Sequence, residues 1–165
     1  MNTLLIGNAV AMIGCTIMVG IGFLRKKNHI LIAQSLQCLF MGAGNLILGG
    51  VTGFISNMVT ILRNLVFARR AVTTPLKLFF IALQILLSLG SLGTGLIGWL
   101  PVLAAVVFTW FLDTNSEVTL KIIIISTLAM WLVYDLYYRN YVASIFDVLT
   151  ICSNSVNLFL MKRNK

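Results

Sequence analysis

Residues 57–64 read NMVTILRN, and 90 positions later residues 147–154 read DVLTICSN. The two stretches share Thr, Ile and Asn in register, and they align Asn57 with Asp147. Because residues three and four positions apart share one face of a helix, each stretch predicts a polar stripe on a helix. Polar groups in apolar surroundings usually face a bundle interior or a water-filled cavity. The two stripes therefore predict two structural repeats that together line one polar site.

The composition is that of an integral membrane protein. Hydrophobic residues make up 59% of the chain and charged residues 10%, with a mean hydropathy of +1.01, whereas soluble domains carry about 25% charged residues. A membrane-spanning helix needs about 20 mostly apolar residues. The connections are too short for a soluble domain, so we predict an all-α fold with a single membrane domain. Its seven predicted spans are Leu4–Leu24, Ile30–Leu48, Gly53–Ala68, Leu76–Leu92, Ile97–Leu112, Thr119–Tyr138 and Tyr141–Met161.

The 90-residue offset extends beyond the two stripes. It also aligns Asn45 with Asp135 and Val66 with Val156. It relates the first three spans to the last three and leaves the fourth as a linker. Since three spans plus a linker return the chain to the same side, both repeats run in the same direction. We predict a 3+1+3 arrangement, with repeat one at 1–70, the linker helix at 71–93 and repeat two at 94–165, related by an axis along the membrane normal.

Basic residues gather in alternate connections. They occur at 25–27, at 69–70 and 77, at 121 and at 162–165, whereas the other connections hold only Arg139. The positive-inside rule then predicts an outside N-terminus and a cytoplasmic C-terminus. This pattern also explains the net charge of +8, so nucleic acid is not an expected partner. The first apolar segment has its basic residues after it, and we interpret it as a retained helix instead of a signal peptide.

The candidate substrate-binding residues lie on the third, sixth and seventh spans. Transporter sites commonly lie where such repeats meet, near the membrane midplane, and the two stripes run from the outer mouth toward that level. Asn157 extends the second stripe by one step, where it either faces the path or holds helices together. The candidates are Asn57, Thr60, Arg63, Asn64, Trp131, Asp135, Asp147, Thr150, Asn154 and Asn157.

Three charged candidates have alternative interpretations. Asp135 and Asp147 either bind a solute or protons near the outer mouth, or they are solvated there or paired with Arg139. Arg63 lies about 15 Å inside its span, where an arginine costs at least about 2.5–3.5 kcal/mol unless it snorkels or finds a partner. Its candidate partners are the amide oxygen of Asn154, backbone carbonyls and an anionic solute.

The sequence holds no recognisable catalytic or cofactor motif. It lacks a Ser/His/Asp arrangement, the H-E-x-x-H motif, a phosphate-binding loop and a dinucleotide fingerprint. Cys15, Cys38 and Cys152 form no C-x-x-C pair, and we interpret them as small packing residues. We therefore expect no enzyme, no metal and no cofactor, and an ATP-driven pump is excluded on this chain alone.

The arrangement resembles the SWEET/PQ-loop superfamily of small-solute transporters. In that group, asparagines on the third and seventh helices and an aromatic residue on the sixth contact a sugar, which here implies Asn64, Asn154 and Trp131, with Asn57 as a further candidate. The chain also resembles the YgjV-type bacterial inner-membrane proteins, through Thr60–Asn64, Trp131–Asp135 and Asn154–Asn157. The hinge prolines and the Pro-Gln pair of the sugar transporters are missing from the first span here.

Two functions follow as hypotheses. The first is facilitative or proton-coupled transport of a small polar solute across the bacterial inner membrane. The second is a non-transporting membrane protein that acts as an assembly or regulatory partner, whose stripes only hold the bundle together. Membrane lipids are the other expected partner, and the sequence leaves open whether the chain forms a homo-oligomer.

Overall fold

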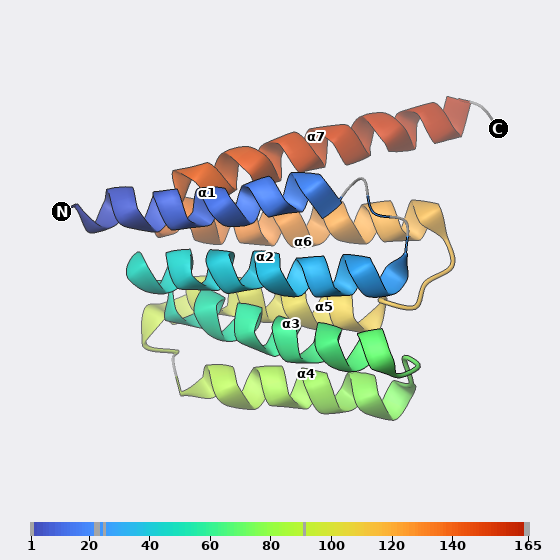
Figure 1. Ribbon diagram of the computed structural model, residues 1–165, viewed down its shortest axis with the longest axis horizontal. Coiled ribbons are helices and arrows are strands. Elements are labelled where there is room, and N and C mark those ends of the chain that lie inside the picture. The colour runs from blue at the N-terminus through green and yellow to red at the C-terminus, as the bar shows by residue number, and fades with distance from the viewer. Residues whose placement is uncertain (1, 22–23, 25, 91, 164–165) are drawn as a thin grey trace.

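The computed structural model describes residues 2–21, 24, 26–90 and 92–163. Within these ranges the chain is helical, with no strand, which confirms the predicted all-α fold class (Figure 1). The elements are α1 (Thr3–Ile21), α2 (Lys27–Ile47), α3 (Val51–Arg69), α4 (Thr74–Leu89), the 3₁₀ helix η1 (Leu92–Gly98), α5 (Trp99–Trp110), α6 (Glu117–Tyr137) and α7 (Tyr141–Arg163).

Five of the described helices are long and apolar enough to cross a membrane. They correspond to α1, α2, α3, α6 and α7, whereas α4 and the stretch Gly95–Trp110 are shorter apolar helices. The predicted spans Leu76–Leu92 and Ile97–Leu112 correspond to these two shorter helices. The chain breaks between them because four glycines fall within residues 90–98, and glycine disfavours a continuous helix. Gly95 has a φ of +65° inside η1, and α5 begins only at Trp99.

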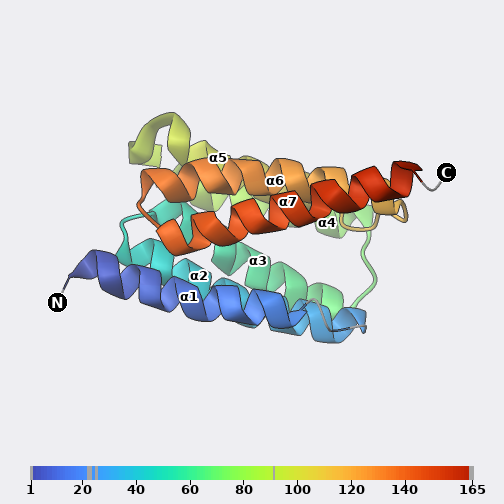
Figure 2. The same cartoon turned by 90° about the horizontal axis from the view of Figure 1, so that it is seen from above.

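The helices form two layers with α4 at one edge. In one layer α2 packs between α1 and α3, and in the other α6 packs between α5 and α7 (Figure 2). The layers meet where α1 contacts α7 and where α3 contacts α5, and α4 packs against α3 and α5.

Small residues bring α1 and α2 close together. A Cβ atom added to Gly44 would lie 3.0 Å from the carbonyl oxygen of Gly7 and 3.2 Å from the Cβ of Ala11. Small residues of this kind allow helix backbones to approach closely in a membrane, where packing replaces the hydrophobic effect as the attraction between helices.

The outward surface of the bundle is apolar. Leu5, Phe79 and Phe159 are 68%, 58% and 67% exposed, and most other exposed large side chains are also leucine, isoleucine, valine or an aromatic residue. Buried positions, in contrast, include many polar side chains. This distribution is the one expected of a bundle whose surface meets lipid acyl chains and whose interior satisfies its own polar groups.

Basic residues gather at one end of the bundle. The α1–α2, α3–α4 and α5–α6 connections and the C-terminus lie at that end, which we call the basic end (Figure 1). It carries the described residues Lys26, Arg69, Arg70, Lys121 and Arg163. The opposite end, with the α2–α3 and α6–α7 turns, is called the turn end. Of the other predicted basic residues, Arg25, Lys165 and the side chains of Lys27 and Lys162 lie outside the described part of the chain.

Lys77 is held inside the first turns of α4. It is 7% exposed, it forms an ion pair with Asp113, and its Nζ donates to the carbonyl oxygen of Trp110 at 2.9 Å. This side chain therefore ties α4 to the end of α5 instead of lying free in the connection.

Candidate functional site

The α2–α3 and α6–α7 turns have the same backbone geometry. Each contains a residue in the left-handed region, Gly49 with a φ of +88° and Arg139 with a φ of +58°. The next residue, Gly50 or Asn140, donates its N–H to the carbonyl oxygen five positions earlier, at 2.7 Å and 2.8 Å respectively. The left-handed residue ends one helix and allows the next to start after a single further residue.

A buried polar plug closes the bundle at the turn end. It consists of Asn45, Tyr134, Asp135 and Asn140, none of which is more than 1% exposed. The amide nitrogen of Asn140 donates to Oδ1 of Asn45 at 2.9 Å and to Oδ1 of Asp135 at 3.3 Å. Its own Oδ1 accepts from the N–H of Ala143 at 3.4 Å, so Asn140 also caps the first turn of α7.

Tyr134 caps α3 from the other layer. The first turn of a helix has N–H groups without a partner inside the helix, and α3 starts after Gly50, which has no side chain to offer. The Tyr134 hydroxyl oxygen accepts from the N–H of Gly53 at 2.7 Å and lies 3.2 Å from the Thr52 hydroxyl, which donates to it. A side chain of α6 therefore completes the start of α3.

Asn8 makes the reciprocal connection from α1 to α7. Its Oδ1 accepts from the N–H of Val142 at 3.0 Å, and its Nδ2 donates to the carbonyl oxygen of Arg139 at 3.0 Å. Each layer thus supplies a side chain that satisfies the start of a helix in the other layer.

A cavity of about 290 Å³ lies between the two layers, on the side of the plug that faces the basic end. Its lining starts at Asp135 of the plug and reaches Ile21, the last residue of α1, at the basic end. Its described lining residues come from α1, α2, α3, α5, α6 and α7, and none comes from α4. Apolar side chains such as Phe108 and Leu128 share the lining with polar ones.

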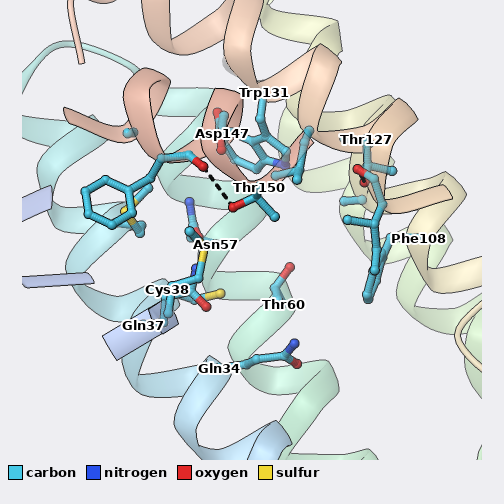
Figure 3. A pocket seen from close by; sticks show the side chains of 18 of the residues that line it. Gln34, Gln37, Cys38, Asn57, Thr60, Phe108, Thr127, Trp131, Asp147 and Thr150 are labelled. Carbon is cyan, nitrogen blue, oxygen red and sulfur yellow. Dashed lines mark hydrogen bonds between the residues drawn. The ribbon is translucent and has the colours of Figure 1, made fainter. Parts of the chain in front are cut away.

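Eight of the ten predicted site residues line this cavity. Figure 3 shows Asn57 and Thr60 of α3 near Asp147 and Thr150 of α7, so the two stripes meet across the space between the layers. The eight are Asn57, Thr60, Arg63, Asn64, Trp131, Asp135, Asp147 and Thr150.

The other two predicted residues lie outside the cavity. Asn154 is half-buried and donates to the carbonyl oxygen of Thr150 in its own helix at 2.9 Å, and Asn157 is exposed. The C-terminal part of α7 diverges from α1 and α6 (Figure 1), which carries the end of the second stripe away from the first.

Arg63 is buried in the cavity wall and does not snorkel. It is 3% exposed. Its NH1 donates to Oγ1 of Thr109 at 2.7 Å, and its Nε and NH2 donate to Oδ1 of Asn64 at 3.3 Å and 3.1 Å. The guanidinium also lies 5.4 Å from the centre of the Phe108 ring. The predicted partner Asn154 was wrong, because the adjacent Asn64 and Thr109 of α5 occupy that position.

Asp135 and Asp147 are not solvated at the membrane surface. They are 1% and 6% exposed, and neither forms an ion pair with Arg139 among the described residues. Oδ2 of Asp147 is buried without a hydrogen-bond partner in this part of the chain. Within the same residues, no group of three or more His, Cys, Asp or Glu side chains could hold a metal ion.

A model of one protein family matches residues 5–165, which is nearly the whole chain. The chain belongs to the Imp-YgjV family of bacterial inner membrane proteins. Together with the apolar helices, this membership makes it a multi-pass protein of the bacterial inner membrane. No curated protein and no solved structure matches it.

Several side chains of the plug and the cavity region are not predicted from the sequence. Asn140 lies in a predicted connection, but an asparagine directly before a helix is a strong capping signal, and the offset aligns it with Gly50. Thr109, Phe108 and Cys38 also belong to the cavity region. No sequence signal distinguishes them, because a single threonine or phenylalanine in an apolar helix usually only packs.

Proposed function

We propose that the chain transports a small polar solute through the cavity between its two layers, by a facilitative or a proton-coupled mechanism. The observation that carries this proposal is the cavity itself, which polar side chains at equivalent positions of α3 and α7 line together. A bundle that needed only stability would fill such a space with apolar side chains, because voids and buried polar groups both cost free energy.

The proposed architecture is two parallel three-helix repeats joined by α4, similar to the SWEET/PQ-loop arrangement. The matching turns support it, since Gly49 and Arg139 have the same unusual backbone conformation 90 positions apart. The packing order α1–α2–α3 and α5–α6–α7 supports it as well. α4 contributes no described residue to the cavity lining, as expected of a linker.

We further propose that the basic end faces the cytoplasm, following the positive-inside rule. The plug then closes the outer side, and the cavity extends toward the cytoplasm. Fusions of a cytoplasm-active and a periplasm-active reporter to the C-terminus test this orientation. Activity of the periplasmic reporter alone would contradict it.

In this proposal the polar, aromatic and acidic residues of the cavity have different roles. Asn57, Thr60, Asn64 and Thr150 supply hydrogen bonds to the solute, and Trp131 offers a ring face for stacking. Asp135 and Asp147, next to the plug, gate the outer mouth or carry protons. Opening the plug would expose the cavity to the other side of the membrane.

The experiment compares Asn64 with its repeat equivalent Asn154. Asn64 is 0% exposed in the cavity wall and donates to Oε1 of Gln34 at 3.4 Å, whereas Asn154 lies outside the cavity. Purified protein is screened by thermal shift against sugars, polyols, amino acids and carboxylic acids, and the solutes found are tested for uptake into liposomes. We expect Asn64→Leu to weaken binding and uptake by roughly tenfold or more, the cost of a lost buried hydrogen bond, and Asn154→Leu to change them little. Absence of any bound or transported solute would contradict the proposal.

One observation favours the alternative of a non-transporting assembly partner. Much of the buried polar network, including the bonds of Asn140 to Asn45 and of Tyr134 to Gly53, serves to join the layers. If Asn64→Leu lowers the melting temperature as much as plug substitutions do, and no solute shifts the wild type, the stripes are structural and this alternative is favoured.

A further inference from the structure

The cavity holds a buried cation that has no acidic partner within the described chain. The ion pair described above, between Lys77 and Asp113, lies elsewhere, and Arg63 forms none. Its hydrogen bonds go to neutral oxygens of Thr109 and Asn64. A buried charge is costly unless an opposite charge compensates it, and Arg63 lies in the wall of a cavity large enough for a small molecule.

A buried carboxyl group lies in the same cavity, nearer the plug. Asp147 is 6% exposed, it lines the cavity, and its buried Oδ2 lacks a hydrogen-bond donor. Figure 3 shows its carboxyl group beside Trp131 and above Thr150. Asp135 lines the same end, but one of its oxygens already accepts from Asn140. Asp147 is therefore the acid better placed to receive a donor from a ligand.

The separation between these groups suits a small molecule. Asp147 is the seventh residue of α7 and Arg63 is the thirteenth residue of α3. Both helices start from equivalent turns at the turn end, so the two residues differ in level by six positions, or about 9 Å along a helix. At that separation the two groups do not pair with each other, but a ligand with two charged ends can bind both.

We propose that the cavity binds a small zwitterion, with its acidic group at Arg63 and its protonated amine at Asp147. The guanidinium has five N–H donors, and the hydrogen bonds described above use three of them. The remaining donors suit a carboxylate or a similar anion. Phe108, Leu128 and Trp131 provide apolar wall for the carbon skeleton between the two charges. This inference rests on the proposed function and names the class of solute.

The test uses probes that differ only in their charged groups. For the skeletons of L-leucine and of 5-aminopentanoate, we compare the amino acid, the acid that lacks the amine, the amine that lacks the acid, and the neutral alcohol, and we add glucose as a neutral sugar. Binding to the purified protein is measured by thermal shift and calorimetry. We expect at least one amino acid to bind roughly tenfold more tightly than its singly charged analogues, because each charged group contacts its own partner.

Substitutions then test which side chain recognises each charged group of the probe. Arg63→Gln should remove the preference for probes with an acidic group, and Asp147→Asn the preference for probes with an amine, each by roughly tenfold. Arg63→Lys, which keeps the charge but loses the planar fork, should retain part of the affinity. Ser153→Gln is the matched control, because Ser153 is the exposed equivalent of Arg63 in the second repeat.

The melting temperature without ligand distinguishes a ligand-binding role of Arg63 from a structural role. A cation that awaits an anionic ligand is not needed for folding, so unliganded Arg63→Gln should melt no lower than the wild type. The inference is overturned if Arg63→Gln lowers the melting temperature sharply and Arg63→Lys restores it without any probe. It is equally overturned if glucose or the alcohols bind the wild type and Arg63→Gln alike, although the proposed transport function then stands. Binding of no probe of any charge contradicts the inference, whereas the proposed transport function fails only if the broader solute screen described above also finds nothing.

Discussion

The α2–α3 and α6–α7 turns are nearly identical in backbone, yet the helices that follow them have different surroundings. The stripe of α3 is enclosed as far as Asn64, which is 0% exposed. The stripe of α7 leaves the cavity after Thr150, so Asn154 is only half-buried. The turns depend on a few neighbouring residues, whereas the stripes depend on which helices pack beside them. Repetition of sequence thus preserves the local turn geometry more faithfully than it preserves the packing around each stripe.

The two turns also differ in how the next helix is capped. α7 receives a cap from its own Asn140, with help from Asn8. The aligned position before α3 is Gly50, and the cap comes from Tyr134 of the opposite layer. The start of α3 therefore depends on a side chain of α6, whereas the start of α7 carries its own cap.

The largest effect is expected where Tyr134 of α6 packs against the start of α3. A Cβ atom at Gly53 would lie 2.6 Å from Cε1 of Tyr134 and 2.9 Å from Nδ2 of Asn45, whereas the aligned residue in α7 is already Ala143. Gly53→Ala should destabilise the protein by about 3 kcal/mol, the upper range for overpacking, measured by chemical or thermal unfolding in detergent.

The matched control for this substitution is Gly20→Ala. No described atom lies within 4 Å of a Cβ atom there, so the helix propensity of alanine should leave the stability unchanged or raise it slightly. Equal melting temperatures for Gly53→Ala and Gly20→Ala would contradict the close packing of Tyr134 against Gly53.

An intermediate effect is expected from removing the cap alone. Tyr134→Phe keeps the ring but leaves the N–H of Gly53 and the hydroxyl of Thr52 without their acceptor, which should cost about 1–3 kcal/mol. Tyr137→Phe, on the same helix with its side chain 61% exposed, should change the unfolding free energy little. A larger loss for Tyr137→Phe would contradict the assigned cap.

The smallest effect is expected at the left-handed residues of the turns. Arg139→Gly should stabilise the protein by about 0.5–1 kcal/mol, because glycine adopts a positive φ without a steric cost. Gly49→Ala should destabilise it by about 1 kcal/mol for the same reason. Both changes are measured by thermal unfolding. The equivalent turns predict opposite signs for the change in unfolding free energy at these two aligned positions. Equal signs would contradict that equivalence.

The fold class and part of the cavity could be predicted because their signals are local and periodic. Asn57, Thr60, Asp147 and Thr150 follow the period of a helix and the 90-residue offset, and all four line the cavity. The fourth and fifth predicted spans, Leu76–Leu92 and Ile97–Leu112, are shorter apolar helices in the structure. Four glycines fall within residues 90–98, and glycine disfavours a continuous helix.

The rest depends on contacts between distant segments. Asn154 has the same period as Thr150, and only the path of α7 relative to α1 and α6 separates them. Thr109 is a single hydroxyl in an apolar helix, and its bond to Arg63 joins residues 46 positions apart. The periodicity of the sequence does not reveal such pairs. It indicates which residues lie on the same face of one helix, but not which other helix packs against that face.

The cap on α3 has a consequence for the order of assembly. Tyr134 follows Gly53 by 81 positions, so during synthesis α3 enters the membrane well before its acceptor has been made. Until then the N–H groups of its first turn depend on water near the bilayer surface, because the acyl-chain region offers no acceptor. The final position of α3 is therefore set late, when α6 arrives, and the first three helices become a finished unit only after the second three are nearly complete.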